Sequence, residues 1–263
     1  MDCGKLVEKG VYSNELEKHY IKYIDVSFLS FGIRLEKNSI LKFFEYLKIL
    51  EYYQKKINIT AITDPYLIIK KHFLDSLSIF NYLKNILIEK SNENVKIIDV
   101  GSGAGFPGIP INIVFPQTKV ILLEARKNKK DILDRTIEKL QLEKIETIQD
   151  RAENIGRKVE HREKYEVVLS RAVASLDVLS EYCLPLCSKN GIFIAYKGNT
   201  YQKELYSNIK VVEELGAKLE EINILKLPDS TKIRSILVFR KIKSTPDRYP
   251  RRNGIPQKRP LCF

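Results

Sequence analysis

The chain of 263 residues has no tryptophan, one methionine, three histidines and four cysteines. The cysteines form no Cys-x-x-Cys pair, and with so few histidines they offer no spacing typical of a zinc site. We therefore expect no metal and reduced thiols, as in a cytoplasmic protein. The four are Cys3, Cys183, Cys187 and Cys262.

Long apolar runs are also missing. No apolar segment reaches the roughly eighteen residues that a membrane-spanning helix requires. The first residues, MDCGKLVEKG, lack the apolar core of an export signal. We therefore expect a cytoplasmic protein with no membrane partner.

Acidic residues are fewer than basic ones: 33 Asp and Glu stand against 45 Lys and Arg, which gives a net charge of +12. Such an excess favours a polyanionic partner over a small neutral substrate. A lysine-rich, AT-biased proteome would produce the same excess, so charge alone leaves both interpretations open.

The most informative stretch is IIDVGSGAGFPG, residues 97–108, in which an apolar strand runs through Asp99 into glycines at 101, 103 and 105. Glycine lets the backbone approach a ligand at the carboxyl end of a strand. No Gly-Lys-Ser/Thr follows, and the third glycine comes one residue early for a dinucleotide motif. The pattern suits S-adenosylmethionine, which has no pyrophosphate, although a tight turn alone would also need glycines.

Glu124 ends the next apolar run, residues 118–123, about twenty residues beyond the glycines. A carboxylate there can accept hydrogen bonds from both ribose hydroxyls of an adenosine cofactor. Nicotinamide and S-adenosylmethionine enzymes both place an acid at this point, so Glu124 does not distinguish them. A solvated acid at a strand end is the alternative interpretation.

Helical spacing of apolar residues dominates the first part of the chain, up to about residue 92. One helix is expected to begin after Asn38-Ser39 and another at Asp64-Pro65, where aspartate caps and proline occupies the first turn. We interpret residues 1–92 as a helical cap and residues 93–241 as the main α/β domain.

Seven short apolar runs, with helices between the first five, predict a mostly parallel seven-stranded sheet. The last two runs are separated only by residues 228–233, so we expect them to form an antiparallel hairpin at one edge. This is the Rossmann-like class I methyltransferase architecture rather than the six-stranded dinucleotide-binding one. The expected strands are 97–100, 120–123, 145–148, 167–170, 192–197, 219–227 and 235–240.

The final stretch is basic and rich in proline: residues 241–263 hold four prolines and seven basic residues against one acid, Asp247. Such a composition predicts a flexible tail over residues 242–263 that builds no core. A basic arm of this kind can lie along a nucleic-acid backbone. A disordered tail that only aids solubility is the alternative.

Several motifs occur together in a fixed order. DVGSGAGFPGIP is followed by LLEARKNKKDIL, by DRAE at 150–153, by SRAVA at 170–174 and by YKG at 196–198, while NITAITDP and KHFLDS lie upstream at 58–65 and 71–76. These motifs resemble, from about residue 40 to 260, those of the ribosomal small-subunit methyltransferase G family, also called glucose-inhibited division protein B.

The resemblance implies an enzyme that uses S-adenosylmethionine to methylate N7 of a guanine in the decoding-centre loop of small-subunit (16S) ribosomal RNA. The substrate would be the RNA or a ribosomal particle, and we expect a monomer. Guanine N7 has an in-plane lone pair, so the reaction requires placement more than a general base.

The family's cofactor contacts fall on five positions of this sequence, and the glycine loop and the strand-end acid complete the expected set. Arg171 and Lys197 are the candidates on the substrate side, and no catalytic residue is certain. A helix N-terminal acid at Glu153 and a lysine with a buried stem at 197 are the alternatives. The expected cofactor-binding residues are Gly101, Gly103, Phe106, Glu124, Ala152, Glu153 and Arg171.

Other chemistry-bearing residues receive structural interpretations. His72 and Asp75 share a helix face, and we expect His72 to form hydrogen bonds where the cap meets the sheet rather than to act as a base. Cys183 and Cys187 are expected one turn apart in a helix over residues 175–187, packed in the core. Lysines 127, 129 and 130 either face RNA or are solvated.

Two other functions remain open from the residues alone. An NAD-dependent oxidoreductase would use the same fold, but the short glycine spacing and the absence of a catalytic His/Lys/Tyr set argue against it. A non-catalytic RNA-binding module with a degenerate pocket is disfavoured by the intact glycines and by the two acids, Glu124 and Glu153.

Overall fold

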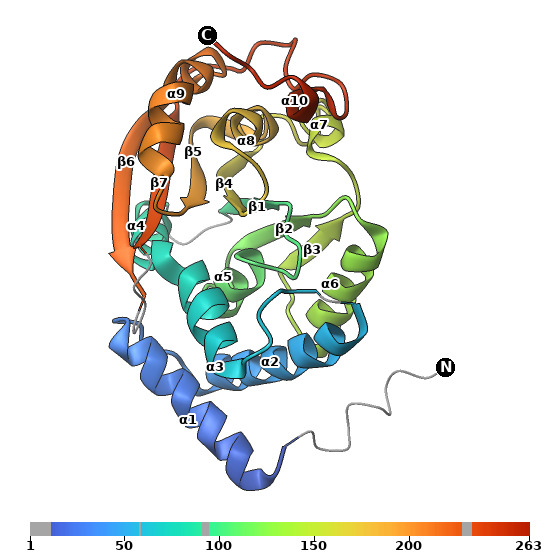
Figure 1. Cartoon of the computed structure of the whole chain (residues 1–263), viewed down its shortest axis with the longest axis vertical. Helices are drawn as coiled ribbons and strands as arrows, with labels where there is room; N and C mark the ends of the chain where they lie inside the picture. The colour runs from blue at the N-terminus through green and yellow to red at the C-terminus, as the bar shows by residue number, and fades with distance from the viewer. Residues whose placement is uncertain (1–11, 58, 91–94, 228–232) are drawn as a thin grey trace.

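The computed structural model describes residues 12–57, 59–90, 95–227 and 233–263. Its centre is a seven-stranded sheet with strand order β3-β2-β1-β4-β5-β7-β6, between two layers of helices (Figure 1). Strands β1 to β5 pair in parallel, and β7 is antiparallel to both neighbours, β5 and β6. The strands are β1 (Lys96–Val100), β2 (Lys119–Leu123), β3 (Ile145–Ile148), β4 (Tyr165–Arg171), β5 (Cys187–Lys197), β6 (Ala217–Lys226) and β7 (Ile233–Lys241).

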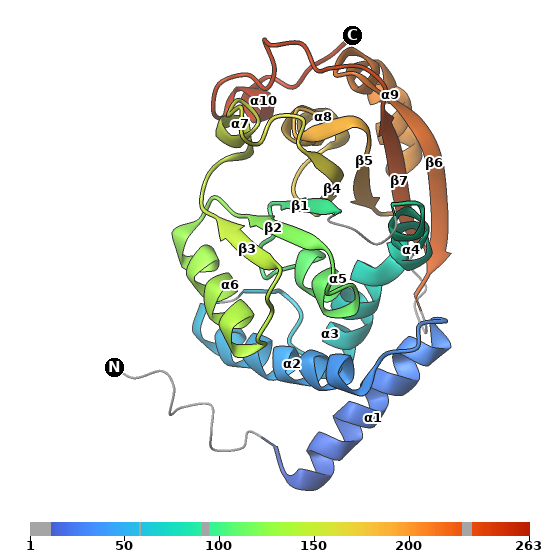
Figure 2. The same ribbon diagram turned by 180° about the vertical axis from the view of Figure 1, so that it is seen from behind.

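This arrangement confirms the predicted Rossmann-like fold with an antiparallel hairpin at one edge (Figure 2). The first residue of β1, Lys96, is exposed and the next four are buried, as expected for a central parallel strand covered on both faces. The expected connection between the hairpin strands falls largely on residues 228–232, which lie outside the described residues.

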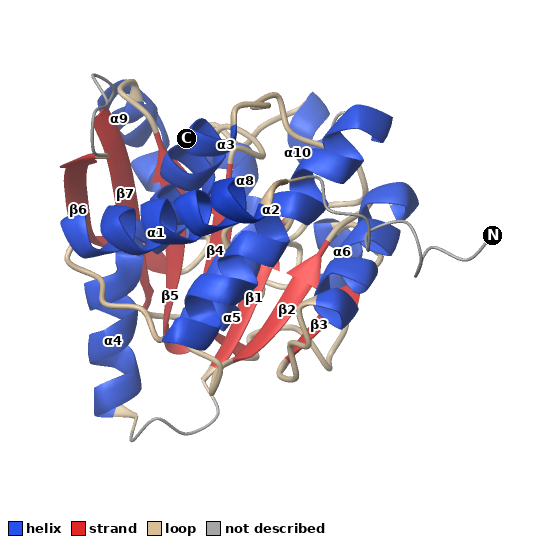
Figure 3. Ribbon diagram, turned by 90° about the horizontal axis from the view of Figure 1, so that it is seen from below, coloured by secondary structure: helices blue, strands red, loops and turns tan. Residues whose placement is uncertain are grey.

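The N-terminal helices cover one face of the sheet (Figure 3). They share a single hydrophobic core with it, in which Phe43 and Phe73 lie with Ile97 and Leu169 of the strands. The expected cap is therefore a layer of the fold rather than a separate lobe. Its elements are α1 (Asn14–Ser30), α2 (Lys37–Ile57), α3 (Pro65–Ile68) with a π-helical continuation over Ile69–Leu74, the 3-10 turn Leu77–Ile79 and α4 (Phe80–Glu89); α5 (Gly108–Val114) and α6 (Lys127–Lys139) contribute to the same core.

The two helix starts expected in this region have different outcomes. The Asp64 carboxylate accepts a hydrogen bond from the Leu67 N–H at 2.9 Å, with Pro65 in the first turn, as expected. Helix α2 begins at Lys37, so the expected start after Ser39 is wrong. The Ser39 hydroxyl instead donates to the Ile113 carbonyl at 3.2 Å and ties α2 to α5.

The opposite face carries α7 (Ala152–Ile155), α8 (Leu176–Cys183) and α9 (Tyr201–Glu214). The expected helix over residues 175–187 is wrong in its second half, because α8 ends at Cys183 and Cys187 begins β5. Pro185 explains the break, since it lacks the N–H that would continue the helix. Both thiols are buried in the core of this face, as expected, and burial raises the pKa of Cys187 to about 12.

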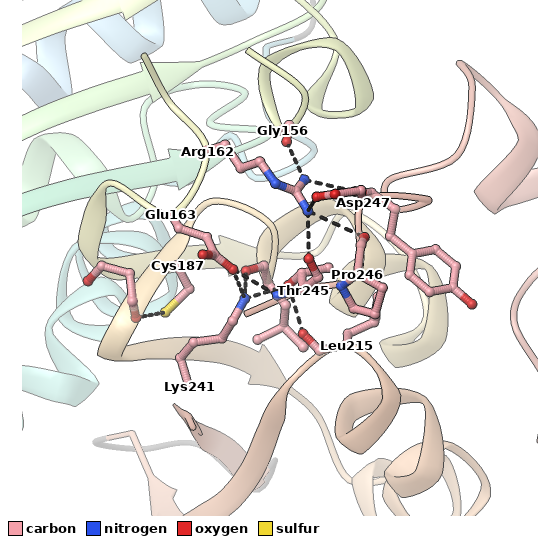
Figure 4. A network of polar contacts seen from close by, with 12 residues as sticks. Gly156, Arg162, Glu163, Cys187, Leu215, Lys241, Thr245, Pro246 and Asp247 are labelled. Carbon is pink, nitrogen blue, oxygen red and sulfur yellow. Dashed lines mark hydrogen bonds and ion pairs between the residues drawn. The ribbon is translucent and has the colours of Figure 1, made fainter. Parts of the chain in front are cut away.

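The segment after β7 is folded, which contradicts the expected flexible tail. Arg162 holds it by donating to the carbonyls of Thr245 at 2.7 Å, Pro246 at 3.3 Å and Tyr249 at 2.8 Å (Figure 4). Tyr249 itself is buried in the core of the α8 face. Composition suggested disorder, but partners on distant elements satisfy the polar groups of the segment.

Two ion pairs, each with one fully buried member, complete this anchoring. The fully buried Lys241 donates to the Leu184 carbonyl at 2.5 Å and lies 3.2 Å from the Glu163 carboxylate. Arg251 binds the Glu181 carboxylate through Nε at 2.9 Å and through Nη2 at 2.7 Å. The segment includes a short helix, α10 (Ile255–Lys258).

Replacing Arg251 by alanine is expected to lower the free energy of unfolding by about 3 to 5 kcal/mol, because it leaves a buried carboxylate without its counter-ion. Glu181 is fully buried, and Arg251 is its ion-pair partner. Urea unfolding followed by circular dichroism measures the change. The control is Arg252→Ala at the exposed neighbouring position, expected within about 0.5 kcal/mol of the parent. Equal stability of both variants would contradict the anchoring role.

Candidate active site

The residues expected from the sequence follow the ends of adjacent parallel strands. Gly101 follows β1, Glu124 follows β2 and Glu153 comes after β3, while Arg171 and Lys197 end β4 and β5. Carboxyl ends of parallel strands meet at one edge of a sheet, which is where open α/β folds bind ligands. The fold therefore places all five along a single edge.

The loop after β1 needs glycine at two positions. At Gly101 the backbone has φ +77°, and a Cβ would lie 2.6 Å from Cγ2 of Val173. At Gly105, with φ +98°, a Cβ would lie 2.4 Å from Cδ1 of Ile109 and 2.7 Å from the Tyr46 hydroxyl. Only glycine adopts both conformations without strain or collision.

Glu124 lies against this loop and is buried. One carboxylate oxygen accepts from the Gly103 N–H at 3.0 Å and the other from the Arg126 N–H at 2.9 Å. Each oxygen retains a second lone pair. The carboxylate can therefore hold a diol while it stays fixed to the loop. Lys129 is near the same place, since its Nζ lies 4.0 Å from where a Cβ of Gly103 would be.

Asp99 lies beneath the loop and is fully buried. Its Oδ2 accepts from the Gly108 N–H at 3.0 Å, whereas Oδ1 has no hydrogen-bond partner among the described residues. Burial raises the pKa of Asp99 from 3.8 to about 7. A buried acceptor without a donor fits a ligand that carries an ammonium or sulfonium charge.

The cofactor-free protein is expected to lose stability through Asp99 as pH rises from about 4 to about 7. The pKa of Asp99 is higher in the folded state, so the folded state binds more protons in this range and stability falls as they are released. Unfolding free energies at several pH values, for the parent and for Asp99→Asn, measure the effect. The variant cannot ionise and should show a shallower decline; identical pH profiles would contradict the prediction.

Phe106, just past the glycines, connects the loop to a second group of side chains. Its ring stacks on the His72 ring, with centroids 4.6 Å apart, and faces the Arg171 guanidinium at 5.0 Å. Arginine only donates hydrogen bonds, so His72 Nδ1 accepts from Arg171 at 3.2 Å. The proton of the neutral ring is then on Nε2, which donates to the Thr60 hydroxyl at 2.7 Å.

His72 is neutral because burial and the nearby Arg171 lower its pKa to about 3. Both ring nitrogens form hydrogen bonds to protein groups, from the N-terminal helices to the end of β4. The geometry is that of a positioning residue for Arg171, in line with the structural role expected from the sequence.

Asp75 joins two arginines from different parts of the chain. Its buried carboxylate accepts from Arg171 through Oδ2 at 3.0 Å and from Arg234 through Oδ1 at 2.9 Å. Arg234 was missed in the sequence. Arg234 lies near Lys197 because the next residue, Ser235, pairs with Lys197 between β7 and β5. This pairing depends on the sheet register, which the sequence does not reveal.

His72, Asp75, Arg171 and Arg234 line a cavity of about 520 Å³, in the range of small-ligand sites. Four cationic side chains and two carboxylates face it. Lys197 donates to the Ala174 carbonyl at 2.9 Å and to Glu204 at 2.7 Å. The charged lining residues are Lys71, Asp75, Arg171, Lys197, Glu204 and Arg234.

Comparison with known proteins identifies the family. A family model described as rRNA small subunit methyltransferase G matches residues 39–234. The chain belongs to this family. The resemblance found in the motifs is therefore confirmed, and so is the function at the level of the family, an S-adenosylmethionine-dependent methyltransferase for small-subunit ribosomal RNA.

Relatives of the family match over most of their length. A ribosomal RNA small subunit methyltransferase G of Acetivibrio thermocellus is 46% identical and covers 88% of this chain and 92% of its own. A second, of Desulforamulus reducens, is 44% identical, and the match covers 87% of this chain and 92% of that protein. Among solved structures, M. jannaschii TYW2 in complex with AdoMet has a TM-score of 0.46 and 17% identity, over 59% of this chain and 76% of that chain.

Membership of the methyltransferase G family leaves no observation that favours the oxidoreductase or the degenerate binding module. In the described ranges, no helix has both the length and the apolar character required to cross a bilayer. Within the same ranges, no three His, Cys, Asp or Glu side chains converge as a metal site would require.

Glu153 has a partner that the sequence did not suggest. Its buried carboxylate accepts from the Gly254 N–H of the C-terminal segment at 2.9 Å. Ala152 begins the helix that follows β3, so Ala152 and Glu153 lie beyond the carboxyl end of that strand, as Glu124 does beyond β2. In this member of the family the C-terminal segment thus borders the expected cofactor site.

Proposed function

We propose that the protein methylates N7 of a guanine in the decoding-centre loop of 16S ribosomal RNA, and that the target base enters the 520 Å³ cavity. One observation carries this: the cavity is rich in hydrogen-bond donors, and each side-chain base among its described lining residues already accepts a hydrogen bond from an arginine or a lysine. His72 accepts from Arg171, and Asp75 accepts from two arginines. Glu204 accepts from Lys197 and from the Leu176 N–H.

A reaction at N7 needs no base, because the lone pair that attacks lies in the plane of the ring and carries no proton. Exocyclic amine or ring-carbon methylation would need a proton acceptor or a thiolate. Cys183 and Cys187 do not offer a thiolate, because burial raises the pKa of both thiols. A lining whose bases are all paired with cations therefore favours N7.

The cofactor residues follow from the same edge of the sheet. Gly101 and Gly103 give the backbone access, Glu124 holds the ribose, and Ala152 with Glu153 recognises the adenine. S-adenosylmethionine supplies the methyl group, as a sulfonium, when bound. The glycine conformations leave the backbone open to a ligand. The unpartnered Asp99 Oδ1 is the acceptor that fits a cation.

Arg171 and Lys197 orient the substrate in this proposal. The Arg171 guanidinium is held over the Phe106 ring by its contacts with Asp75 and His72, and a fork of this kind matches guanine O6 or a phosphate. Lys197 has little conformational freedom, since Glu204 and the Ala174 carbonyl hold its ammonium group. Arg171 and Lys197 thus place the target base. In this proposal the protein acts as a monomer in the cytoplasm, and its substrate is the RNA or a ribosomal particle.

Methyl transfer to an RNA transcript and to purified small subunits tests the proposal. Mass mapping should find one added methyl group on a single guanine, at N7. A transcript made with 7-deazaguanosine keeps the base shape but has carbon at that position, so it should accept no methyl group. Equal methylation of the 7-deaza transcript, or a methyl group on an exocyclic amine, would refute N7 as the target.

A further inference from the structure

The carboxylates around the C-terminal segment, residues 242–263, are used to hold it in place. Glu181 pairs with Arg251 and Glu214 with Arg248, while Glu153 accepts from the Gly254 N–H. The one acid of the segment, Asp247, lies 3.7 Å from Arg162. These carboxylates are therefore already paired with groups of the segment or with a neighbouring arginine.

The outer side of the segment carries cations without such partners. Arg252, Lys258 and Arg259 are exposed, and none of them forms an ion pair with the residues that the structure describes. They lie on a backbone that is already folded and anchored by Arg162 and Arg251. A polyanion that binds here would not have to order the chain first, which favours affinity.

The position of the segment relates it to the reaction edge. It leaves β7 beside the amino end of β5, since Arg240 pairs with Ile192. It then crosses the α8 face and reaches Glu153, beyond the carboxyl end of β3. Helix α10 lies beside α7 in opposite views of the molecule (Figures 1 and 2). Gly254, which lies between these cations in the chain, is therefore next to Glu153 of the expected cofactor site.

We propose that Arg252, Lys258 and Arg259 form a second RNA-docking surface, which binds backbone phosphates of the substrate outside the reaction cavity. The inference rests on the proposed function for the identity of the RNA. Phosphate contacts of this kind position a nucleic acid and do not read its sequence. The surface should thus affect binding of the RNA and not the chemical step.

The test compares two triple variants with equal loss of charge. The first is Arg252→Ala/Lys258→Ala/Arg259→Ala, and the control is Lys18→Ala/Lys22→Ala/Lys37→Ala. The control lysines are exposed on α1 and at the start of α2, at the opposite end of the molecule from α10 (Figure 1). Fluorescence anisotropy measures binding of a labelled decoding-region transcript between 50 and roughly 200 mM salt, the range over which phosphate contacts are resolved.

The C-terminal variant should bind the transcript about tenfold more weakly, and the slope of log affinity against log salt should become shallower by about 2 to 3. Its affinity for S-adenosylhomocysteine, its melting temperature and its kcat at saturating RNA should match the parent. Equal slopes for the two triple variants would overturn the docking surface. Binding is measured without turnover, so failure of methyl transfer by the parent would refute the proposed function separately.

Discussion

Replacing Gly101 by valine is expected to weaken binding of S-adenosylhomocysteine by about 100-fold or more, equivalent to about 2.7 kcal/mol. A side chain at this position meets two obstacles. The backbone has φ +77°, and the first side-chain atom would lie 2.6 Å from Val173 Cγ2. Because Gly101 also donates its N–H to the Leu123 carbonyl at 2.9 Å, the loop cannot shift without losing its attachment to β2.

Calorimetric titration with S-adenosylhomocysteine measures this loss, and Gly32→Val is the matched control. Gly32 has φ +79°, but no atom lies within 4 Å of its Cβ position, so the control carries the backbone strain without the collision. It should lower stability and leave the cofactor affinity within about twofold, because it is remote from the loop. Parental affinity in Gly101→Val would show that the cofactor does not bind at this loop.

Replacing Arg171 by lysine is expected to lower kcat/KM for RNA methylation by about 100-fold, although the charge is kept. The guanidinium contacts Asp75 at 3.0 Å, His72 at 3.2 Å and the face of Phe106 at the same time. An ammonium group has neither the planar fork nor the flat surface that these contacts require. The base would therefore be misplaced relative to the cofactor.

Single-turnover methylation at saturating S-adenosylmethionine measures this effect, with Arg234→Lys for comparison. Arg234 contacts Asp75 through Nε alone, at 2.9 Å, so its replacement should cost about tenfold or less. Cofactor affinity should stay near the parental value in both variants if these residues serve the substrate. Full activity of Arg171→Lys would show that only the charge at this position matters.

Short sequence motifs predicted the features whose conformation is set by adjacent residues, such as loops and helix ends. The alternate glycines after Asp99 predicted a loop at the strand end where the backbone can approach a ligand, and Asp64-Pro65 predicted a helix start. Pro185 was also a local signal, and it marks the end of α8 where a longer helix was expected. These features depend on steric and hydrogen-bonding preferences within a few residues.

The C-terminal segment shows where composition misleads. Its prolines and basic residues predicted disorder, yet Arg162, Glu163 and Glu181 stabilise it from 70 to 87 residues away in the chain. Composition describes what a segment can do alone, and a segment this poor in apolar residues cannot form a core by itself. In the folded protein, hydrogen bonds and ion pairs with residues of distant elements hold the segment in one conformation.

The sequence by itself determined the order of strands and helices, the glycine loop, the acid after β2 and the family. The tertiary structure decided which charges meet: Asp75 lies 96 residues from Arg171 and 159 from Arg234, yet it binds both. Strand and turn preferences are short-range and can be read from adjacent residues. Ion pairs in a cavity depend on the sheet topology, which brings the ends of β4, β5 and β7 together only after folding.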